Sequence, residues 1–235
     1  MMQKTAHNTP GVFITFEGGE GVGKSTHILL LALRLEAAGV EVLRLREPGG
    51  TRIGEAIRQI LLDPTNGEMD DVSELLLYEA ARAQLVAQII EPALARGVTV
   101  LCDRFTDSTL AYQGVARGLG LEPVERANYL GSKGLVPRRT IILTHDPREA
   151  LERATEEGAD RLEAEGLAFH TRVLEGFTRI AERDPERVRL VQSREHRAET
   201  AEAIFAELAD LFPEAAGRDF AITQELIDQV RETHD

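Results

Sequence analysis

A glycine-rich segment lies between a strand-like run at 12–17 and a helix-like run that begins at Lys24, and it matches the pattern G-x-x-x-x-G-K-[ST] in full. Glycines let successive backbone N–H groups turn inward around phosphate oxygens, and the N-terminus of the following helix adds its positive end. The lysine can reach β- and γ-phosphates, and the serine hydroxyl can ligate Mg²⁺. The residues predicted to hold nucleotide phosphates are Gly18, Gly19, Glu20, Gly21, Val22, Gly23, Lys24 and Ser25.

Charged side chains follow two further strand-like runs. Asp103 and Arg104 come at the end of the nearly continuous apolar run 98–103. A carboxylate there can hold Mg²⁺ directly or through water, and a guanidinium offers a planar fork that suits a phosphate. The turn at 46–51 contains a proline and two glycines, which hold the chain in one shape and let a ligand approach the backbone.

Two groups of polar and aromatic side chains are candidates for recognising a small polar ligand. Tyr78 and Arg82 are four residues apart on a predicted helix, so they share one face and can present an aromatic ring and a cation together. A core tyrosine beside a solvated arginine is the structural alternative for this pair. Hydroxyl, phenol and amide groups also gather just after Asp103, where they suggest a polar binding site. These residues are Ser108, Thr109, Tyr112 and Gln113.

The elements that must position these residues alternate between strands and helices. This alternation predicts right-handed βαβ crossovers and a three-layer α/β fold, with a five-stranded parallel sheet flanked by helices. Sites in such sheets collect beyond the carboxyl ends of the strands, which is where the candidates fall. The predicted strands are 12–17, 41–46, 98–103, 139–144 and 187–192. The predicted helices are 24–38, 53–62, 72–96 with a kink or break at Pro92, 147–157, 161–183 and 196–211.

Composition limits the classes of function. A net charge of −13 argues against broad binding to nucleic acid or to an anionic membrane, although a compact anion pocket stays compatible with it. The single cysteine, Cys102, excludes an internal disulfide and indicates a reducing compartment. The chain also lacks an apolar run long enough to span a bilayer, so we expect a cytoplasmic protein without nucleic-acid or membrane partners.

The chain is expected to divide into three parts. Residues 1–10 form a flexible N-terminal segment, and 11–212 form one nucleotide-binding domain. Residues 213–235 are an appendage after Pro213, in which apolar residues recur at roughly helical spacing and predict a terminal helix. A solvated or partner-packed helix is a simpler interpretation of this appendage than a catalytic role.

Four ordered motifs together resemble the bacterial thymidylate kinases: 16–26, 46–51, 103–105, and Ser108 with 111–114. The similarity continues through 160–163 and 169–170, covering roughly residues 12–212. The resemblance implies a P-loop nucleoside-monophosphate-kinase-like fold. It also implies transfer of the γ-phosphoryl group of ATP to dTMP, which yields dTDP and ADP, with Mg²⁺ and in a homodimer.

The resemblance assigns roles residue by residue. Thr26 would join the phosphate loop in holding ATP, Ser25 and Asp103 would hold Mg²⁺, and Glu20 would lie near the acceptor and the metal. Tyr78 would stack on thymine and Arg82 would reach its oxygen, while the Tyr112 phenol would crowd a 2′-hydroxyl and favour deoxyribose. Arg104 would grip the dTMP phosphate. The residues expected to bind dTMP are Glu47, Pro48, Tyr78, Arg82, Arg104, Ser108, Thr109, Tyr112 and Gln113.

The region expected to close over ATP, a lid at about 148–162, departs from the family pattern. Such kinases supply a transition-state arginine from the P-loop or from the lid, but this P-loop has none and the middle of the lid is acidic. Arg153 and Arg161 are the remaining lid candidates. The predicted catalytic residues are Glu20, Lys24, Asp103, Arg104, Arg153 and Arg161. A second departure is Thr144-His145, where the family more often has an aspartate at the first position.

Two alternatives to a thymidylate kinase stay open from the sequence. One is a P-loop kinase for another nucleotide or nucleoside, and competition among possible acceptors would distinguish it. The other is a nucleotide-binding regulatory protein with weak or lost kinase activity, because the lid has few arginines and the chain has gained a tail.

Overall fold

The structure is a computed structural model that describes residues 11–154 and 160–232. The predicted flexible segment 1–10, the part of the predicted lid at 155–159, and residues 233–235 lie outside the described residues. Side chains are described for 11–150 and 160–230.

A parallel sheet with the strand order β2-β3-β1-β4-β5 forms the centre of the molecule. Each strand lies within one residue of its predicted bounds, so the predicted five-stranded parallel sheet is confirmed. The strands are β1 (Phe13–Gly18), β2 (Val42–Arg46), β3 (Thr99–Asp103), β4 (Arg139–Thr144) and β5 (Val188–Gln192).

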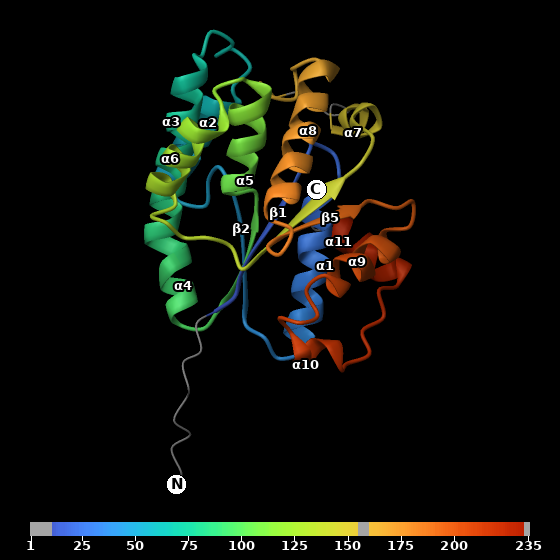
Figure 1. The fold of residues 1–235 in the computed structure, drawn as a ribbon. Helices are drawn as coiled ribbons and strands as arrows, with labels where there is room; N and C mark the ends of the chain where they lie inside the picture. Colours follow the sequence, from blue (N-terminus) through green and yellow to red (C-terminus); the bar gives the residue numbers. More distant parts are fainter. Residues whose placement is uncertain (1–10, 155–159, 233–235) are drawn as a thin grey trace.

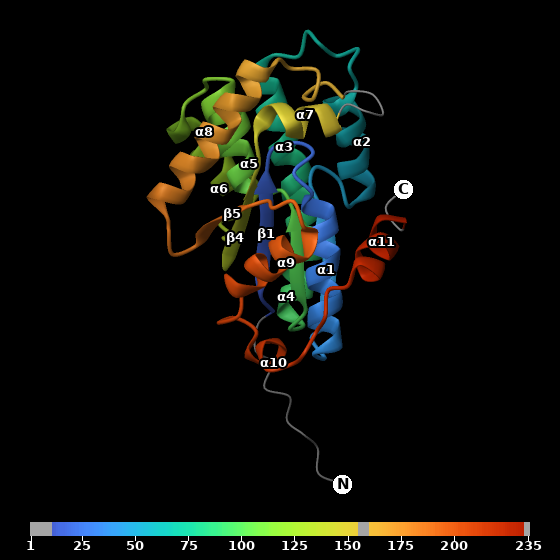
Figure 2. The same ribbon diagram turned by 90° about the vertical axis from the view of Figure 1, so that its right-hand side faces the viewer.

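Helices pack against the apolar side chains on both faces of the sheet, which gives three layers (Figures 1 and 2). On β1, Ile14 and Phe16 face the helices α1 (Lys24–Ala37) and α9 (Arg197–Ala206), and Phe13 faces the opposite layer. Successive side chains of a strand point to opposite faces, so a strand with apolar residues at nearly every position is buried on both sides. The opposite layer contains α3 (Asp71–Leu85) and α8 (Leu167–Arg183), with α2 (Arg52–Leu62) packed on α3.

The helix predicted at 161–183 begins later, as α8 at Leu167. The Asp160 carboxylate accepts the backbone N–H groups of Leu162 and Glu163, each at 2.8 Å, and this turn competes with a helix. Helix α7 spans Pro147–Ala154, and the predicted end of this helix at 157 lies outside the described residues.

The helix predicted at 72–96 consists of three consecutive pieces. Helix α3 continues into the π-helical turn η1 (Val86–Ile90) and then into α4 (Glu91–Ala95). Pro92 comes just after the π-helical turn; its ring removes one backbone donor, and the helical run continues past it as α4. The irregularity that was expected at the proline therefore precedes it.

Residues 106–116 and 121–131 are helical, although the sequence analysis assigned no helix there. They form α5 (Thr106–Thr109), the π-helical η2 (Leu110–Ala116) and α6 (Leu121–Gly131). The buried Val124 and Asn128 recur at helical spacing on α6, a signal that polar neighbours such as Glu122 and Arg126 obscured.

The carboxyl ends of the central strands meet at one edge of the sheet. Asp103 at the end of β3 pairs with Phe16 of β1 and with Arg46 of β2, and Gly18 pairs with Leu143 of β4. This register brings together four segments that are far apart in the sequence: the glycine-rich loop, the turn after β2, and the residues that follow β3 and β4.

The chain after β5 packs beside α1. It forms α9, the short α10 (Pro213–Ala216) and the terminal α11 (Gln224–Glu232). Figure 2 shows α10 near the lower end of α1 and α11 alongside its upper part. None of the helices in the described ranges is long and apolar enough to cross a membrane.

Candidate active site

The glycine-rich loop between β1 and α1 adopts a conformation that requires its glycines. Gly18 has φ +134°, and a Cβ atom there would lie 2.3 Å from the backbone oxygen of Leu143. Gly21 and Gly23 have φ +65° and +91°. L-residues with side chains rarely adopt these angles, so the motif that is visible in the sequence is also the one that the backbone needs.

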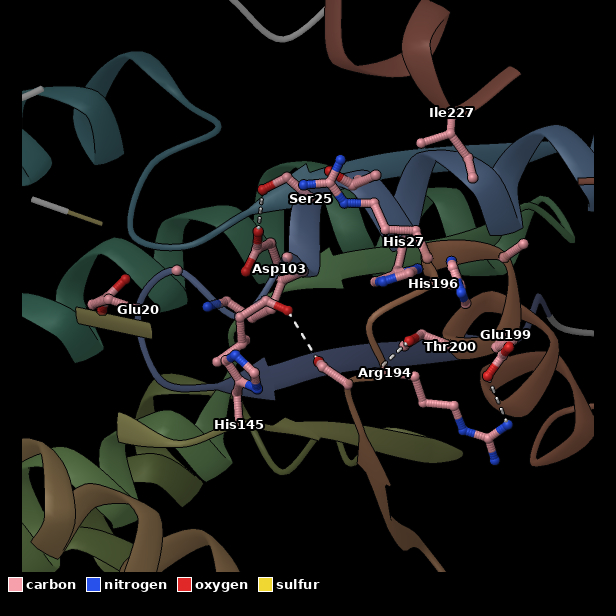
Figure 3. Close-up of a pocket in the computed structure, with 18 of the residues that line it drawn as sticks. Glu20, Ser25, His27, Asp103, His145, Arg194, His196, Glu199, Thr200 and Ile227 are labelled. Carbon is pink, nitrogen blue, oxygen red and sulfur yellow. Dashed lines mark hydrogen bonds and ion pairs between the residues drawn. The ribbon is translucent and has the colours of Figure 1, made fainter. Parts of the chain in front are cut away.

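Lys24, Ser25 and Asp103 converge at the start of α1. Lys24 Nζ donates a hydrogen bond to the backbone oxygen of Gly19 at 2.8 Å, and Ser25 Oγ donates to Asp103 Oδ2 at 3.0 Å (Figure 3). Burial lowers the pKa of Lys24, and the Arg104 guanidinium lowers it further. A desolvated ammonium interacts strongly with any phosphate that enters the loop.

The donor set fits Mg²⁺. Ser25 and Asp103 offer a hydroxyl and a carboxylate oxygen at the mouth of the loop, and Mg²⁺ usually binds one or two carboxylates together with substrate phosphates. Among the described residues, no cluster of three or more His, Cys, Asp or Glu side chains could form an all-protein metal site. A site completed by the nucleotide is the arrangement that these residues allow.

A cavity of about 1240 Å³ opens from the loop toward α9 and α11. Its lining has six lysine or arginine residues and six carboxylates, so the wall is far less acidic than the chain's net charge of −13. The basic residues that line it are Lys24, Arg46, Arg58, Arg104, Arg194 and Arg197. Local compensation of this kind lets an acidic protein bind an anion.

Arg104, Glu20 and Tyr112 form one hydrogen-bonded group. Arg104 Nη2 donates to Glu20 Oε1 at 2.5 Å, the Tyr112 hydroxyl donates to the same oxygen at 3.0 Å, and Arg104 lies 5.1 Å from the Tyr112 ring centroid. Burial acts to raise the pKa of Glu20, but Arg104 and Lys24 outweigh it and lower the pKa to about 2. Glu20 is therefore ionised at neutral pH and holds the guanidinium in place.

A second cavity, of about 140 Å³, adjoins the first. The structure brings all nine predicted dTMP-binding residues into its lining. Five further residues that the sequence analysis had not assigned to this ligand also line it: Arg58, Leu62, Asp160, Leu162 and Glu163, in addition to Glu20.

Arg82 is buried in the floor of this second cavity, where it donates hydrogen bonds to several side chains. The described residues accept four of its five N–H groups: Glu47 at 2.8 Å, Glu79 at 2.6 Å, Asn128 at 2.8 Å and Thr109 at 2.9 Å. One N–H is left for a ligand. The sequence could not show this network, because its members come from separate elements.

Glu47 shares this floor and has an unsatisfied oxygen. Its Oε2 accepts from Arg82, and its buried Oε1 has no hydrogen-bond partner among the described residues. Burial raises the pKa of Glu47 to about 7 in spite of Arg82. A buried acceptor without a partner costs free energy, so a donor from a bound ligand would stabilise this side chain.

The two cavities share four lining residues, Glu20, Glu47, Arg58 and Arg104. The sequence analysis did not single out Arg58, which lies on α2 and donates to the backbone oxygen of Pro48 at 3.0 Å. In the sequence, Arg58 is indistinguishable from a solvated arginine on a helix. Its place at the junction follows from the packing of α2 beside the turn after β2.

The structure does not bring Arg161 to the phosphate loop. Its side chain is buried, with Nε donating to the Leu61 backbone oxygen at 2.8 Å and Nη2 2.5 Å from Glu74 Oε2. The side chain of Arg153 lies outside the described residues. A transition-state role for either arginine stays a prediction, and in this arrangement Arg161 fastens the turn at 160–165 to α2 and α3.

His145 lies at the edge of the large cavity, and its Nε2 is 3.1 Å from Glu149 one turn further along the chain. The contact is local, since it joins side chains four residues apart. Thr144 is the last residue of β4, and the metal role of Asp103 stays a prediction.

A phosphate loop, a Mg²⁺-compatible carboxylate after a neighbouring strand, and two cavities that meet at paired cations define a P-loop nucleoside monophosphate kinase. The thymidylate kinase family model matches residues 16–204. The chain is 50% identical to a thymidylate kinase of Pelotomaculum thermopropionicum, over 78% of this chain and 86% of that protein. It is 46% identical to one from a Synechococcus species (88% and 100% covered) and 45% identical to one from Deinococcus radiodurans (85% and 97%). The chain belongs to the thymidylate kinase family.

Proposed function

We propose that this chain transfers the γ-phosphoryl group of ATP to dTMP, which yields dTDP and ADP for dTTP biosynthesis. The observation that carries the proposal is the junction of the two cavities, where Glu20, Glu47, Arg58 and Arg104 line both. A donor phosphate in the large cavity and an acceptor phosphate in the second cavity would be adjacent at this junction. The names of the relatives agree with this acceptor.

On the donor side, the glycine-rich loop and Lys24 would hold the phosphates of ATP, and Ser25 with Asp103 would hold Mg²⁺, which would supply positive charge to the phosphates. On the acceptor side, Tyr78 covers the base, the free N–H of Arg82 reaches a base oxygen, and Tyr112 packs against the sugar.

The chemical step requires no covalent intermediate with the protein. An oxygen of the dTMP phosphate attacks the γ-phosphorus, and the bond from that phosphorus to the β–γ bridging oxygen breaks, leaving the electron pair on ADP. Lys24 and Arg104 hold fixed positive charge beside the transferred group, and Arg58 extends it across the junction. Alignment and charge neutralisation supply the catalysis.

The test is acceptor competition among dTMP, dUMP, dCMP and thymidine in a coupled assay of ADP release. We expect kcat/KM for dTMP to exceed that for dUMP by roughly 10- to 200-fold, because one methyl group in a shaped pocket contributes about 1–3 kcal/mol. The turnover of the Lys24→Ala variant gives the baseline rate for an inactive phosphate loop. Absence of a dTMP preference would contradict the acceptor assignment, and tight binding with turnover no faster than this baseline would instead support the regulatory alternative.

We also propose that the family's homodimer forms through α3 and α6. Four apolar side chains on these adjacent helices are exposed: Val72 (49%), Leu76 (59%), Tyr129 (73%) and Leu130 (79%). The exposed apolar side chains on these two neighbouring helices support an interaction surface there.

Sedimentation equilibrium should give twice the chain mass of 25.9 kDa, and Leu76→Glu should shift the protein toward the monomer. Leu190→Glu, a change at an exposed leucine on β5, is the control and should leave the mass unchanged. A monomeric wild type would refute the dimer.

The division into a kinase domain at 11–212, with its lid at about 148–162, and an appendage at 213–235 is likewise a proposal. It is supported by the family match, which ends at 204. A cytoplasmic location stays a prediction, and the buried, unpaired Cys102 is compatible with it.

A further inference from the structure

Glu74 lies on the same face of α3 as two residues of the second cavity, Tyr78 and Arg82, because the three are spaced four residues apart and all are buried. Tyr78 and Arg82 line that cavity, but Glu74 does not. Its carboxylate is fully buried behind the cavity wall. Glu74 can therefore affect a ligand in the cavity only through another side chain.

That side chain is Gln113, which lies on η2 beside α3. Gln113 Nε2 donates a hydrogen bond to Glu74 Oε1 at 2.6 Å. A carboxylate can only accept, so this contact fixes which end of the Gln113 amide faces α3. No described residue donates a hydrogen bond to Gln113 Oε1, and Gln113 lines the second cavity. The amide therefore offers its carbonyl oxygen, an acceptor, to a ligand there.

Two arginines keep the Glu74 carboxylate ionised and in place. Arg161 Nη2 and Arg117 Nη2 lie 2.5 and 3.2 Å from Glu74 Oε2, and Arg117 Nε makes a longer contact of 3.4 Å with Oε1. Burial acts to raise the pKa of Glu74, but hydrogen bonds from Gln113 and Arg117 and the charges of both arginines outweigh it and lower the pKa. Because the arginines hold Oε2, the Gln113 amide has the close contact with Oε1.

A fixed acceptor in the cavity wall discriminates between pyrimidine bases. Thymine and uracil carry an N–H donor at ring position 3, whereas cytosine has an acceptor nitrogen there. The oxygen of Gln113 can pair with the first kind of base and opposes the second. The remaining N–H of Arg82 is a donor, so the wall presents one donor and one acceptor. This pair is complementary to the oxygen at position 4 and the N–H at position 3 of thymine.

We propose that Glu74 is a positioning residue that selects bases with an N–H at position 3, by holding the Gln113 amide with its oxygen toward the ligand. The inference rests on the proposed function, because it takes a pyrimidine nucleotide as the acceptor substrate. It assigns part of the base specificity to a carboxylate outside the cavity, which the sequence analysis did not single out.

The Glu74→Gln variant tests the proposal, because it keeps the shape of the side chain but has a single acceptor oxygen. The two guanidinium groups attract that oxygen, which turns the new NH₂ group toward Gln113. The Gln113 amide must then rotate to present its own oxygen to this NH₂ group, and its nitrogen faces the ligand. The acceptor that opposes a cytosine ring is thereby replaced with a donor.

The measurement is isothermal titration of the full chain with dTMP and with 5-methyl-dCMP, which differ only at ring positions 3 and 4. We expect the ratio of the Kd of 5-methyl-dCMP to the Kd of dTMP to fall about ten- to a hundredfold in Glu74→Gln, since a favourable hydrogen bond to dTMP becomes a contact between two donors. The contact of Arg82 with position 4 is common to both proteins and cancels from this comparison.

Glu165→Gln is the matched control. It makes the same substitution in the same ion-pair network, because Glu165 Oε1 accepts from Arg117 Nη1, but Glu165 does not contact Gln113. We expect it to leave the Kd ratio within twofold of wild type. Glu74→Asp is a second variant, which keeps the buried charge beside the arginines and withdraws the carboxylate from Gln113 by one methylene. It should lower the ratio by a smaller factor than Glu74→Gln.

Steady-state kinetics distinguishes positioning of the base from general loosening of the fold. Glu74→Gln should raise the KM for dTMP and keep kcat within about threefold of wild type, because other residues hold the phosphates. A lower Kd ratio in both Glu74 variants, with the control unchanged, supports the proposal.

An unchanged ratio in the Glu74 variants, an equal fall in Glu165→Gln, or a loss of kcat without a change in the ratio overturns the inference. These outcomes leave the proposed function intact as long as the wild type phosphorylates dTMP. A wild type that does not phosphorylate dTMP would refute the proposed function itself, and the inference with it.

Discussion

Replacing Arg104 with alanine is expected to lower kcat/KM for dTMP by roughly 10²- to 10³-fold, the range seen when a preorganised donor to developing charge is lost. Arg104 lines both cavities and donates to Glu20 at 2.5 Å, to the Gly18 backbone oxygen at 3.0 Å and to Ser108 Oγ at 3.1 Å. The variant loses a phosphate ligand and leaves the Glu20 carboxylate facing the incoming phosphates with less compensation.

The Arg104→Lys variant distinguishes the contribution of the positive charge from that of the planar guanidinium. It keeps the cation but not the planar fork, so we expect it to recover only part of the activity. The residue has φ +68°, a backbone cost that arginine, alanine and lysine share, so the comparison isolates the side chain. Steady-state kinetics with both substrates measures the effect, and Arg126→Ala, which changes an exposed arginine on α6, is the control. Activity within threefold of wild type for Arg104→Ala would rule out this role.

Exchanging Glu17 for glutamine is expected to remove a large part of the pH dependence of stability. Glu17 is fully buried at the end of β1, where it accepts hydrogen bonds from the Phe105 backbone N–H at 2.8 Å and from the Ser108 hydroxyl. Burial raises the pKa of its carboxyl from 4.5 to about 8, and the neighbouring Asp107 adds to the rise. At neutral pH the folded protein therefore holds a proton that the unfolded chain releases.

The sign follows from proton uptake. Between pH 4.5 and about 8 the folded state binds more protons at Glu17 than the unfolded state does, so the free energy of unfolding falls as pH rises. From pH 5.5 to 8.5 the wild type should lose roughly 3 kcal/mol more than Glu17→Gln, which keeps the acceptor oxygen and does not titrate. Urea unfolding at the two pH values measures the difference.

Glu47, whose pKa is also raised, titrates in both proteins and cancels from this comparison. Glu122→Gln, at a side chain that is 76% exposed, is the matched control and should follow the wild type. Parallel pH profiles for wild type and Glu17→Gln would show that Glu17 is ionised in the folded protein and would refute the prediction.

The sequence by itself determined the features that depend on neighbouring residues. The phosphate loop is contiguous from Gly18 to Ser25, because its glycines serve the backbone conformation of that one turn. The five strands were predictable to within one residue, since continuous apolar runs bounded by turns report burial on both faces. The helices at 106–131 were missed because polar side chains broke up a short periodic pattern.

Only the tertiary structure decided which side chains meet. Arg58 reaches the junction of the cavities and Arg161 turns instead to Glu74, although both are arginines in helix-prone or lid-like sequence. Ile227 joins the wall of a cavity whose loop lies at the other end of the chain. The spacing of apolar residues along the sequence indicates which side chains are buried. The residues they contact depend on how distant elements pack, and the sequence of one element does not contain that information.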